Sequence, residues 1–267
     1  MPRIPTPMLH ILSASSFRTK LTGRQASMDL MDLPQMAHEE LELHGLAIPT
    51  DLLKGWNNKQ LEHLRRNSDK AACPALLLHE PTLQPLSKPK NADDAVERLR
   101  RVFRAAERLG CSSAGFGIQA SDNEREFEFV VESLKQVMET AEQLGVNMLI
   151  QPAPGLTETP DRVTELIKRV GGFRIGSLPD FEAAASSGDP AHYLRRLAPY
   201  APVLFASTLE FYKKGTHKSY DLGACIGALQ EVGYDATVAL EYRGDDDPMK
   251  GVRQTHDEIR RLLEASA

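Results

Sequence analysis

The stretch Thr140–Gly155, TAEQLGVNMLIQPAPG, contains the end of an amphipathic helix, then a glycine, then a short apolar strand. A glycine just after a helix adopts the left-handed conformation at no steric cost, and so turns the chain directly into the strand. The strand ends on Gln151, a neutral amide, where the strand of a parallel barrel presents its functional side chains. This helix–glycine–strand unit is the pattern that indicates the fold.

The same unit recurs along the chain. Further copies lie at 39–48 (EELELHGLAI), 105–118 (AAERLGCSSAGFGI), 166–178 (LIKRVGGFRIGSL) and 228–242 (ALQEVGYDATVALEY). Repeated junctions of this kind indicate helices that alternate with buried, parallel strands.

Counting these units predicts eight strands and eight helices. Strands are expected at 9–15, 46–49, 75–79, 114–118, 147–150, 173–178, 203–206 and 237–240, and helices near 32–44, 57–70, 92–109, 124–144, 159–170, 190–198, 221–232 and 248–264. Eight such units in about 250 residues is the size of one (β/α)8 TIM barrel, which we expect to span residues 1–267 as a single domain. A doubly wound sheet is the competing architecture, but the chain has neither its G-x-G-x-x-G fingerprint after a first strand nor a Walker A motif.

Composition excludes several classes of protein. A formal net charge of -5 argues against a nucleic-acid or anionic-membrane surface, and the longest apolar runs are too short to cross a bilayer. Cys73, Cys111 and Cys225 are widely spaced and form no CxxC, so we expect neither a disulfide framework nor a thiolate zinc site. We read no signal peptide in the first residues and expect a cytoplasmic protein.

In a barrel, the active site lies at the carboxyl ends of the strands. The polar candidates at those positions are His79, Glu80, Gln119, Gln151, Asp180, Glu182, Thr208, Glu210, Glu241 and Arg243. Asp180 and Glu241 directly follow apolar runs (RIGSLPD and TVALE), so we expect both carboxylates to point inward near the barrel axis.

Two loops add further candidates. Trp56 follows the second strand and is expected either to stack on a sugar face or to anchor its loop. The seventh loop, TLEFYKKGTHKSYD, holds Lys213, Lys214, His217 and Lys218 within six residues. These side chains either neutralise an anionic group at the mouth or are simply solvated.

The sequence resembles the sugar-isomerase/epimerase superfamily of TIM barrels, the xylose-isomerase-like group that includes ketose 3-epimerases, inosose dehydratases and endonuclease IV. The resemblance runs through nearly the whole chain, in LSASSF, AERLGC, AEQLGVNMLIQP, GYDATVALEYRGDDDP and GVRQTHDEIRRLL. It implies a divalent metal bound by Glu, Asp, His and Glu at the ends of strands five to eight, with the two glutamates as acid and base.

Carried onto this chain, those four positions fall on Gln151, Asp180, Ala206 and Glu241, and a further His or Asn of the family falls on Ala183. An amide in place of a carboxylate removes a hard anionic ligand, and alanine in place of histidine removes a ligand outright. We therefore expect no cofactor beyond a weakly held Mn²⁺ or Mg²⁺ on Asp180, Glu241 and Gln151. The three-metal site and cationic DNA face of endonuclease IV are excluded.

The leading hypothesis is an isomerase or epimerase of carbohydrate metabolism that acts on a sugar, polyol or small hydroxy-carbonyl compound. Glu241 is the expected general base or acid, and Asp180 is its partner. The residues expected to bind substrate are Gln151, Gln119, His79, Trp56, Lys214, His217 and Arg243. A non-catalytic sugar-binding barrel that lost its metal, and a metal-independent lyase or dehydratase, are the alternatives. The resemblance also implies a homodimer or homotetramer.

Overall fold

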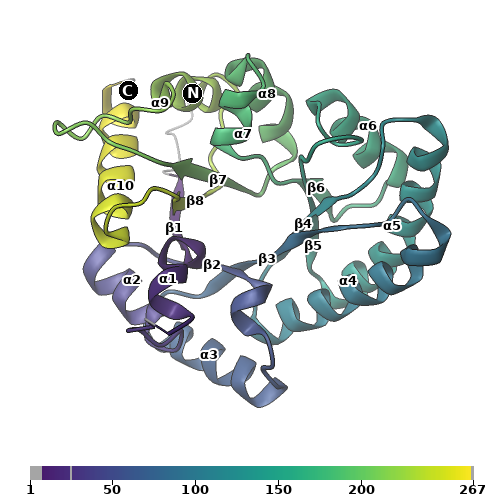
Figure 1. The fold of residues 1–267 in the computed structure, drawn as a ribbon, viewed down its shortest axis with the longest axis horizontal. Helices are drawn as coiled ribbons and strands as arrows, with labels where there is room; N and C mark the ends of the chain where they lie inside the picture. Colours follow the sequence, from purple (N-terminus) through teal and green to yellow (C-terminus); the bar gives the residue numbers. More distant parts are fainter. Residues whose placement is uncertain (1–7, 25, 266–267) are drawn as a thin grey trace, which may run out of the picture.

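Eight parallel strands form a ring surrounded by helices in the computed structural model, which describes residues 8–24 and 26–265 (Figure 1). The strands are β1 (Leu9–Ser13), β2 (Leu46–Pro49), β3 (Ala75–Gln84), β4 (Ser113–Ile118), β5 (Asn147–Gln151), β6 (Ile175–Ser177), β7 (Val203–Thr208) and β8 (Thr237–Tyr242). The helices are α1 (Arg18–Leu21), α2 (Leu33–Leu41), α3 (Asn58–Lys70), α4 (Pro89–Leu109), α5 (Glu124–Leu144), α6 (Pro160–Val170), α7 (Phe181–Ser186), α8 (Pro190–Leu197), α9 (Leu222–Glu231) and α10 (Pro248–Ala265), with 3₁₀ turns at Ala14–Phe17, Thr50–Leu53 and Ala198–Tyr200.

The ring closes between β6 and β7, just beyond the short β6 strand. Parallel ladders join the strands in the order β6-β5-β4-β3-β2-β1-β8-β7. Across the remaining seam, the Phe205 N–H donates to the Pro179 carbonyl at 2.9 Å, and Asp180 forms a parallel bridge with Phe205. The architecture is therefore a (β/α)8 barrel, as the repeated junctions predicted.

The apolar core consists of two layers. The inner cluster fills the barrel with Ile11, Ala47, Leu77, Leu149, Leu178, Val203, Phe205 and Ala239. The outer cluster packs the other face of the strands against the helices, and Ala206 belongs to this outer layer. β4 contributes Gly115 to the interior, where an added Cβ would lie 2.4 Å from Leu178 Cδ2, so a larger residue would collide with the inner cluster.

Several local predictions need correction. The strands expected at 9–15 and 173–178 are shorter, Leu9–Ser13 and Ile175–Ser177. The six-residue helix α7 was not expected, because a helix this short carries too little periodicity to be detected. The junction at 39–48 also differs from the other four. Here α2 ends on Glu42, which itself takes the left-handed conformation (φ 55°), and Gly45 serves packing instead, since an added Cβ would meet Ile11 at 2.9 Å.

Cys73, Cys111 and Cys225 are all buried and unpaired, which confirms the expectation of no disulfide. Across the described part of the chain, we find no helix with the length and apolar character needed to cross a bilayer.

A partly buried histidine pair joins the first strand to the last helix. The rings of His10 on β1 and His256 on α10 meet edge to face at 5.1 Å between centroids, and His10 Nε2 is buried with no hydrogen-bond partner in the structure. Burial, together with the charges of His256 and Arg260, lowers the pKa of His10 to about 4. His10 is therefore neutral in the folded protein at neutral pH.

This depressed pKa predicts a loss of stability in acid. Between the unfolded-state pKa near 6.5 and about 4, the unfolded chain binds the proton more readily, so the free energy of unfolding falls as pH drops through this window. We expect His10 to account for roughly 2 to 3 kcal/mol of the loss between pH 7 and pH 4.5.

Urea unfolding of wild type and His10→Gln at both pH values measures this contribution. The variant should lose less stability in acid than wild type, whereas His192→Gln, which alters an exposed side chain on α8, should behave as wild type. Equal losses for His10→Gln and wild type would contradict the assignment.

Candidate active site at the carboxyl end of the barrel

Alternation along the strands selects which side chains enter the mouth of the barrel. Residues two positions beyond an inner-core residue face the same side of a strand. Applied to Ile11, Leu77, Leu149, Phe205 and Ala239, this rule points Ser13, His79, Gln151, Ser207 and Glu241 inward at the carboxyl ends. Asp180 joins them at the seam beyond β6.

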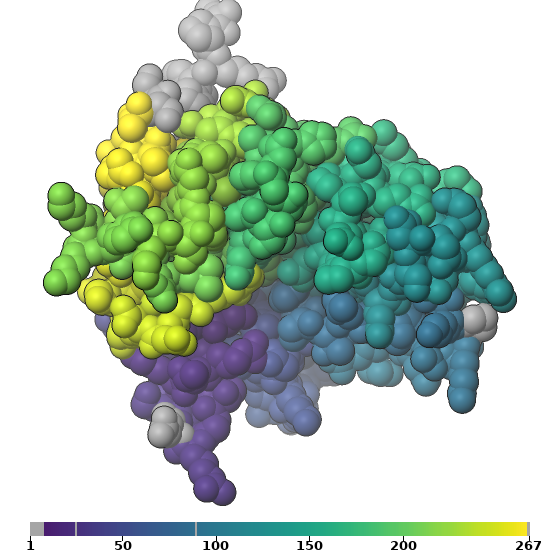
Figure 2. All heavy atoms as spheres, turned by 45° about the horizontal axis from the view of Figure 1, so that its top comes forward, coloured from purple at the N-terminus to yellow at the C-terminus, as the bar shows by residue number. Residues whose placement is uncertain are grey.

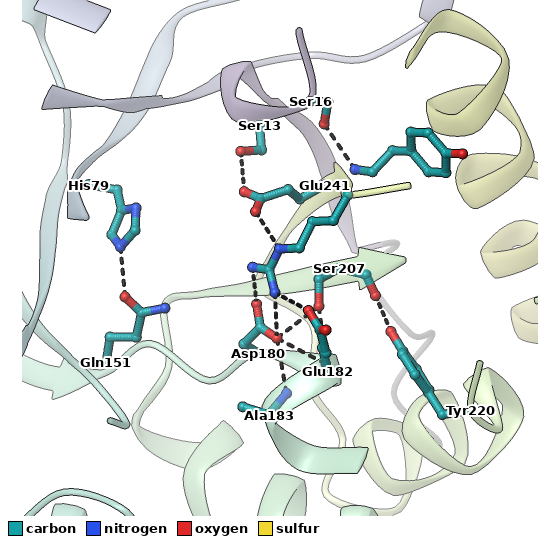
Figure 3. A network of polar contacts seen from close by, with 12 residues as sticks. Ser13, Ser16, His79, Gln151, Asp180, Glu182, Ala183, Ser207, Tyr220 and Glu241 are labelled. Atoms are coloured by element: carbon teal, nitrogen blue, oxygen red, sulfur yellow. Dashed lines mark hydrogen bonds and ion pairs between the residues drawn. The ribbon is translucent and has the colours of Figure 1, made fainter. Parts of the chain in front are cut away.

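The guanidinium of Arg243 binds three carboxylates of this group, those of Asp180, Glu182 and Glu241, which Figure 3 labels. Nε donates to Glu241 Oε1 at 2.7 Å, and Nη1 donates to Glu182 Oε2 at 2.6 Å. Nη2 donates to Asp180 Oδ2 at 2.6 Å, and a longer contact of 3.4 Å from Nη1 to Asp180 Oδ1 completes a two-pronged interaction. Three carboxylates therefore share one guanidinium.

These carboxylates differ in exposure. The side chains of Asp180 and Glu241 are 5% and 9% exposed, whereas Glu182 is 37% exposed and Arg243 31%. Burial alone would lower the pKa of Arg243, but the charges of Asp180 and Glu241 outweigh it and hold the pKa above its ordinary value. The guanidinium is thus permanently charged and compensates two nearly buried carboxylates.

Asp180 is fixed by four further interactions besides its ion pair. Its Oδ1 accepts from the backbone N–H groups of Glu182 (2.9 Å) and Ala183 (3.1 Å), which makes it the N-cap of α7. The Ser207 hydroxyl donates to the same oxygen at 2.8 Å, and the backbone of Asp180 bridges to Phe205. Ordinary helix capping explains part of this geometry, but the second oxygen is free for Arg243.

Glu241 is held from two sides. The Ser13 hydroxyl on neighbouring β1 donates to Oε2 at 2.5 Å, while Arg243 holds Oε1. Each carboxylate oxygen has two lone pairs, so Oε2 retains one for a proton or a substrate hydroxyl.

His79 and Gln151 form a separate neutral pair across the mouth (Figure 3). The His79 Nε2 atom lies 2.7 Å from Gln151 Oε1, and the imidazole packs edge to face against Phe205. Burial lowers the pKa of His79 below its usual range in spite of the hydrogen bond to Gln151. Because the amide oxygen only accepts, the neutral ring carries its proton on Nε2.

The residue of β7 that faces the site is Ser207, not Ala206. Ser207 is the register partner of Glu241, and its hydroxyl reaches Asp180, whereas Ala206 packs in the outer core. The placement of the family's histidine on Ala206 was therefore one residue out, and with a period of two that error moves a side chain to the other face of the strand.

Three other predicted substrate-binding residues lie away from this cluster. Gln119 is exposed, and its backbone N–H donates to the Gln84 carbonyl. Trp56 is partly buried against the outer core, in agreement with the loop-anchor interpretation. The exposed Lys214 lies on the seventh loop, which projects from the edge of the molecule rather than across the strands (Figures 1 and 2).

His217 anchors that loop. Its Nε2 accepts from the Leu209 N–H at 3.1 Å, and its Nδ1 donates to the Tyr220 carbonyl at 3.0 Å. Burial lowers the pKa of His217, in keeping with a neutral ring that uses both nitrogens for the loop's own backbone. The loop therefore does not supply the positive charge that its sequence suggested.

Ser13 and Ser207 are the site residues that sequence reasoning missed. Each lies two residues after an inward apolar residue, Ile11 and Phe205 respectively, so strict alternation from those residues would have identified both.

The site does not suit the metal that the family resemblance implies. No group of three or more His, Cys, Asp or Glu side chains within 8–24 and 26–265 is arranged to hold an ion. Gln151 is hydrogen-bonded to His79, and Ser207 lies where an imidazole would be needed. The carboxylates of Asp180 and Glu241 converge on a guanidinium. A divalent ion would have to displace Arg243, and neither Gln151 on β5 nor Ser207 on β7 would add an anionic or imidazole ligand to the carboxylates that converge there.

The fold is shared with several sugar-converting enzymes. A D-psicose 3-epimerase from Clostridium cellulolyticum H10 superposes with a TM-score of 0.75 at 15% identity, over 97% of this chain and 98% of that one. An L-ribulose 3-epimerase gives 0.80 at 14% identity (97% and 95%), and a 3-keto-D-glucoside 4-epimerase from E. coli gives 0.75 at 12% identity (95% and 99%). Identities this low establish the shared fold alone.

Among curated protein sequences, none matches this chain. The family model described as xylose isomerase-like TIM barrel matches residues 37–263, which include strands β2 to β8. The chain belongs to the xylose isomerase-like TIM-barrel family.

Proposed function

We propose that this protein is an isomerase or epimerase that moves a proton on a carbon next to a carbonyl group, in a sugar, polyol or small hydroxy-carbonyl compound. The observation that carries the proposal is Glu241, a nearly buried carboxylate aimed into the barrel mouth and held by Ser13 and Arg243. A general base must be fixed within reach of the proton it removes, and both oxygens of Glu241 are positioned by rigid strands.

The other side chains of the mouth have distinct roles in this proposal. Asp180 is the partner carboxylate, held by Ser207 and the start of α7. The neutral pair His79 and Gln151 orients substrate hydroxyls, since both present hydrogen-bonding groups without a charge. Gln119 takes no part, because it is exposed and bonds only through its backbone.

The epimerases with the same fold support the choice of substrate class. They are named for ketoses and a keto-glucoside, all of which carry a carbonyl beside hydroxylated carbons. A carbohydrate of this kind suits a mouth lined by carboxylates, an amide and hydroxyl groups.

A non-catalytic sugar-binding barrel is the second candidate. It is favoured by one observation, that Asp180, Glu182 and Glu241 are already paired with Arg243 and none is an unpaired base. Binding of a sugar without proton exchange would support this candidate over the enzyme.

Glu241→Gln is expected to abolish proton exchange and to leave sugar binding intact. The amide keeps the shape of the side chain but cannot accept the proton. Loss of a general base lowers the rate of proton transfer by about 100- to 10,000-fold. Incorporation of deuterium from D₂O into a panel of ketoses, followed by NMR, measures the rate.

Glu210→Gln is the matched control, because Glu210 is an exposed carboxylate paired with Lys218 on the projecting loop. Its exchange rate should equal that of wild type. Exchange unaffected by Glu241→Gln, or absent with every ketose in wild type, would rule out the isomerase proposal.

Gln151→Ala is expected to weaken ligand binding instead. Losing the amide removes one substrate contact and the acceptor that orients His79, a cost of about 1 to 2 kcal/mol or roughly 5- to 30-fold in Kd. Calorimetric titration with the ketose that exchanges fastest tests this, and an unchanged Kd would remove Gln151 from the binding site.

A further inference from the structure

A positive charge can stabilise an enediolate, and the cations around the barrel differ in the carboxylates that they contact. Lys213 and Lys214 are exposed on the projecting loop. Arg98 and Arg18 are paired with Glu80 and Asp51. The guanidinium of Arg243 alone among these cations lies against both Asp180 and Glu241.

We propose that the Arg243 guanidinium is a built-in cation that takes the place of the divalent metal at this barrel mouth. It binds the two carboxylates that the family would direct to the metal, at 2.6 Å (Asp180) and 2.7 Å (Glu241). A guanidinium is always charged and presents its N–H groups in a fixed planar fork, so it organises carboxylates without any exchangeable ion.

The backbone holds this cation in place. Arg243 directly follows β8, and its N–H donates to the Thr208 carbonyl at 2.7 Å, which extends the β7–β8 pairing by one residue. The side chain therefore starts from a fixed point beside Glu241. The third carboxylate, Glu182 at the start of α7, closes the outer side of the guanidinium.

Two neighbouring residues of the mouth also suit a guanidinium better than a divalent metal. Gln151 offers an amide where a metal site needs an anion, and Ser207 offers a hydroxyl that donates to Asp180 instead of an imidazole. Both substitutions remove ligands that a dication requires and that a guanidinium does not. Several residues of the mouth therefore suit a guanidinium in place of a metal ion, which differs from the loss of a single metal ligand.

One N–H of the guanidinium remains available. Of its five N–H groups, four point to carboxylate oxygens, and the second N–H of Nη2 has no acceptor among residues 8–24 and 26–265. If the proposed function holds, this N–H donates to the substrate oxygen that gains negative charge when Glu241 removes the neighbouring proton.

Thermal unfolding with and without Mn²⁺ tests whether the Arg243 guanidinium takes the place of the divalent metal. Wild type should show the same Tm with Mn²⁺ or with EDTA, and should bind no Mn²⁺ by calorimetry. Arg243→Ala leaves three carboxylates without their partner, so its Tm should fall by roughly 5 to 10 °C, and Mn²⁺ should restore part of the loss.

Arg98→Ala is the matched control, because Arg98 likewise pairs with a buried carboxylate, Glu80, but has no contact with Asp180 or Glu241. Its Tm should fall without any recovery in Mn²⁺. Arg243→Lys keeps the charge and loses the planar fork, and is expected to lie between wild type and Arg243→Ala and to stay insensitive to Mn²⁺.

Two results would overturn the inference. One is Mn²⁺ binding to wild type at a single site that Glu241→Gln removes, which is decisive even if Arg243→Ala does not fold. The other is a folded Arg243→Ala protein whose Tm does not respond to Mn²⁺. Neither measurement uses a ketose, so the cation role can hold while the proposed isomerase activity fails.

Discussion

One guanidinium surrounded by three carboxylates is the interaction on which the mouth of this barrel depends. Two nearly buried carboxylates, Asp180 at the seam beyond β6 and Glu241 on β8, converge on Arg243. Without Arg243 they would repel one another and lose most of their solvation, which is costly in a site this enclosed. The remaining interactions at the mouth, from Ser13, Ser207 and the start of α7, then only have to orient groups whose charge is already compensated.

Much of the fold follows from local sequence signals. The glycines at 110 and 145 adopt the left-handed conformation at the ends of α4 and α5, as the repeated junctions require. Features that depend on tertiary packing could not be predicted from these local signals. Glu42 ends α2, whereas Gly45 lies close to Ile11 just before β2, and nothing in the local pattern distinguishes that glycine from the others.

The sequence predicted the two buried carboxylates of the candidate site, but it did not predict their hydrogen-bond and ion-pair partners. Asp180 and Glu241 stand out because each follows an apolar run, and both lie in the mouth. Alternation identifies Ser207 only once Phe205 is known to face the interior, and the run VLFAST has apolar residues on both faces, so Ser207 was overlooked in favour of Ala206. Nor does sequence show that Arg243 folds back over the strand ends while the lysines of the seventh loop point away, since side-chain direction is set by neighbours distant in the chain.

The seam between β6 and β7 has a consequence for how this barrel can change. Asp180 there contributes to ring closure through its backbone, to the start of α7 through its carboxylate, and to the ion cluster through its second oxygen. A substitution at this position disturbs folding and chemistry together, so laboratory evolution toward new substrates has little freedom at the seam. The loops after β2 and β3, on the opposite side of the ring from the β6–β7 closure, are the region in which altered specificity can accumulate without opening the barrel.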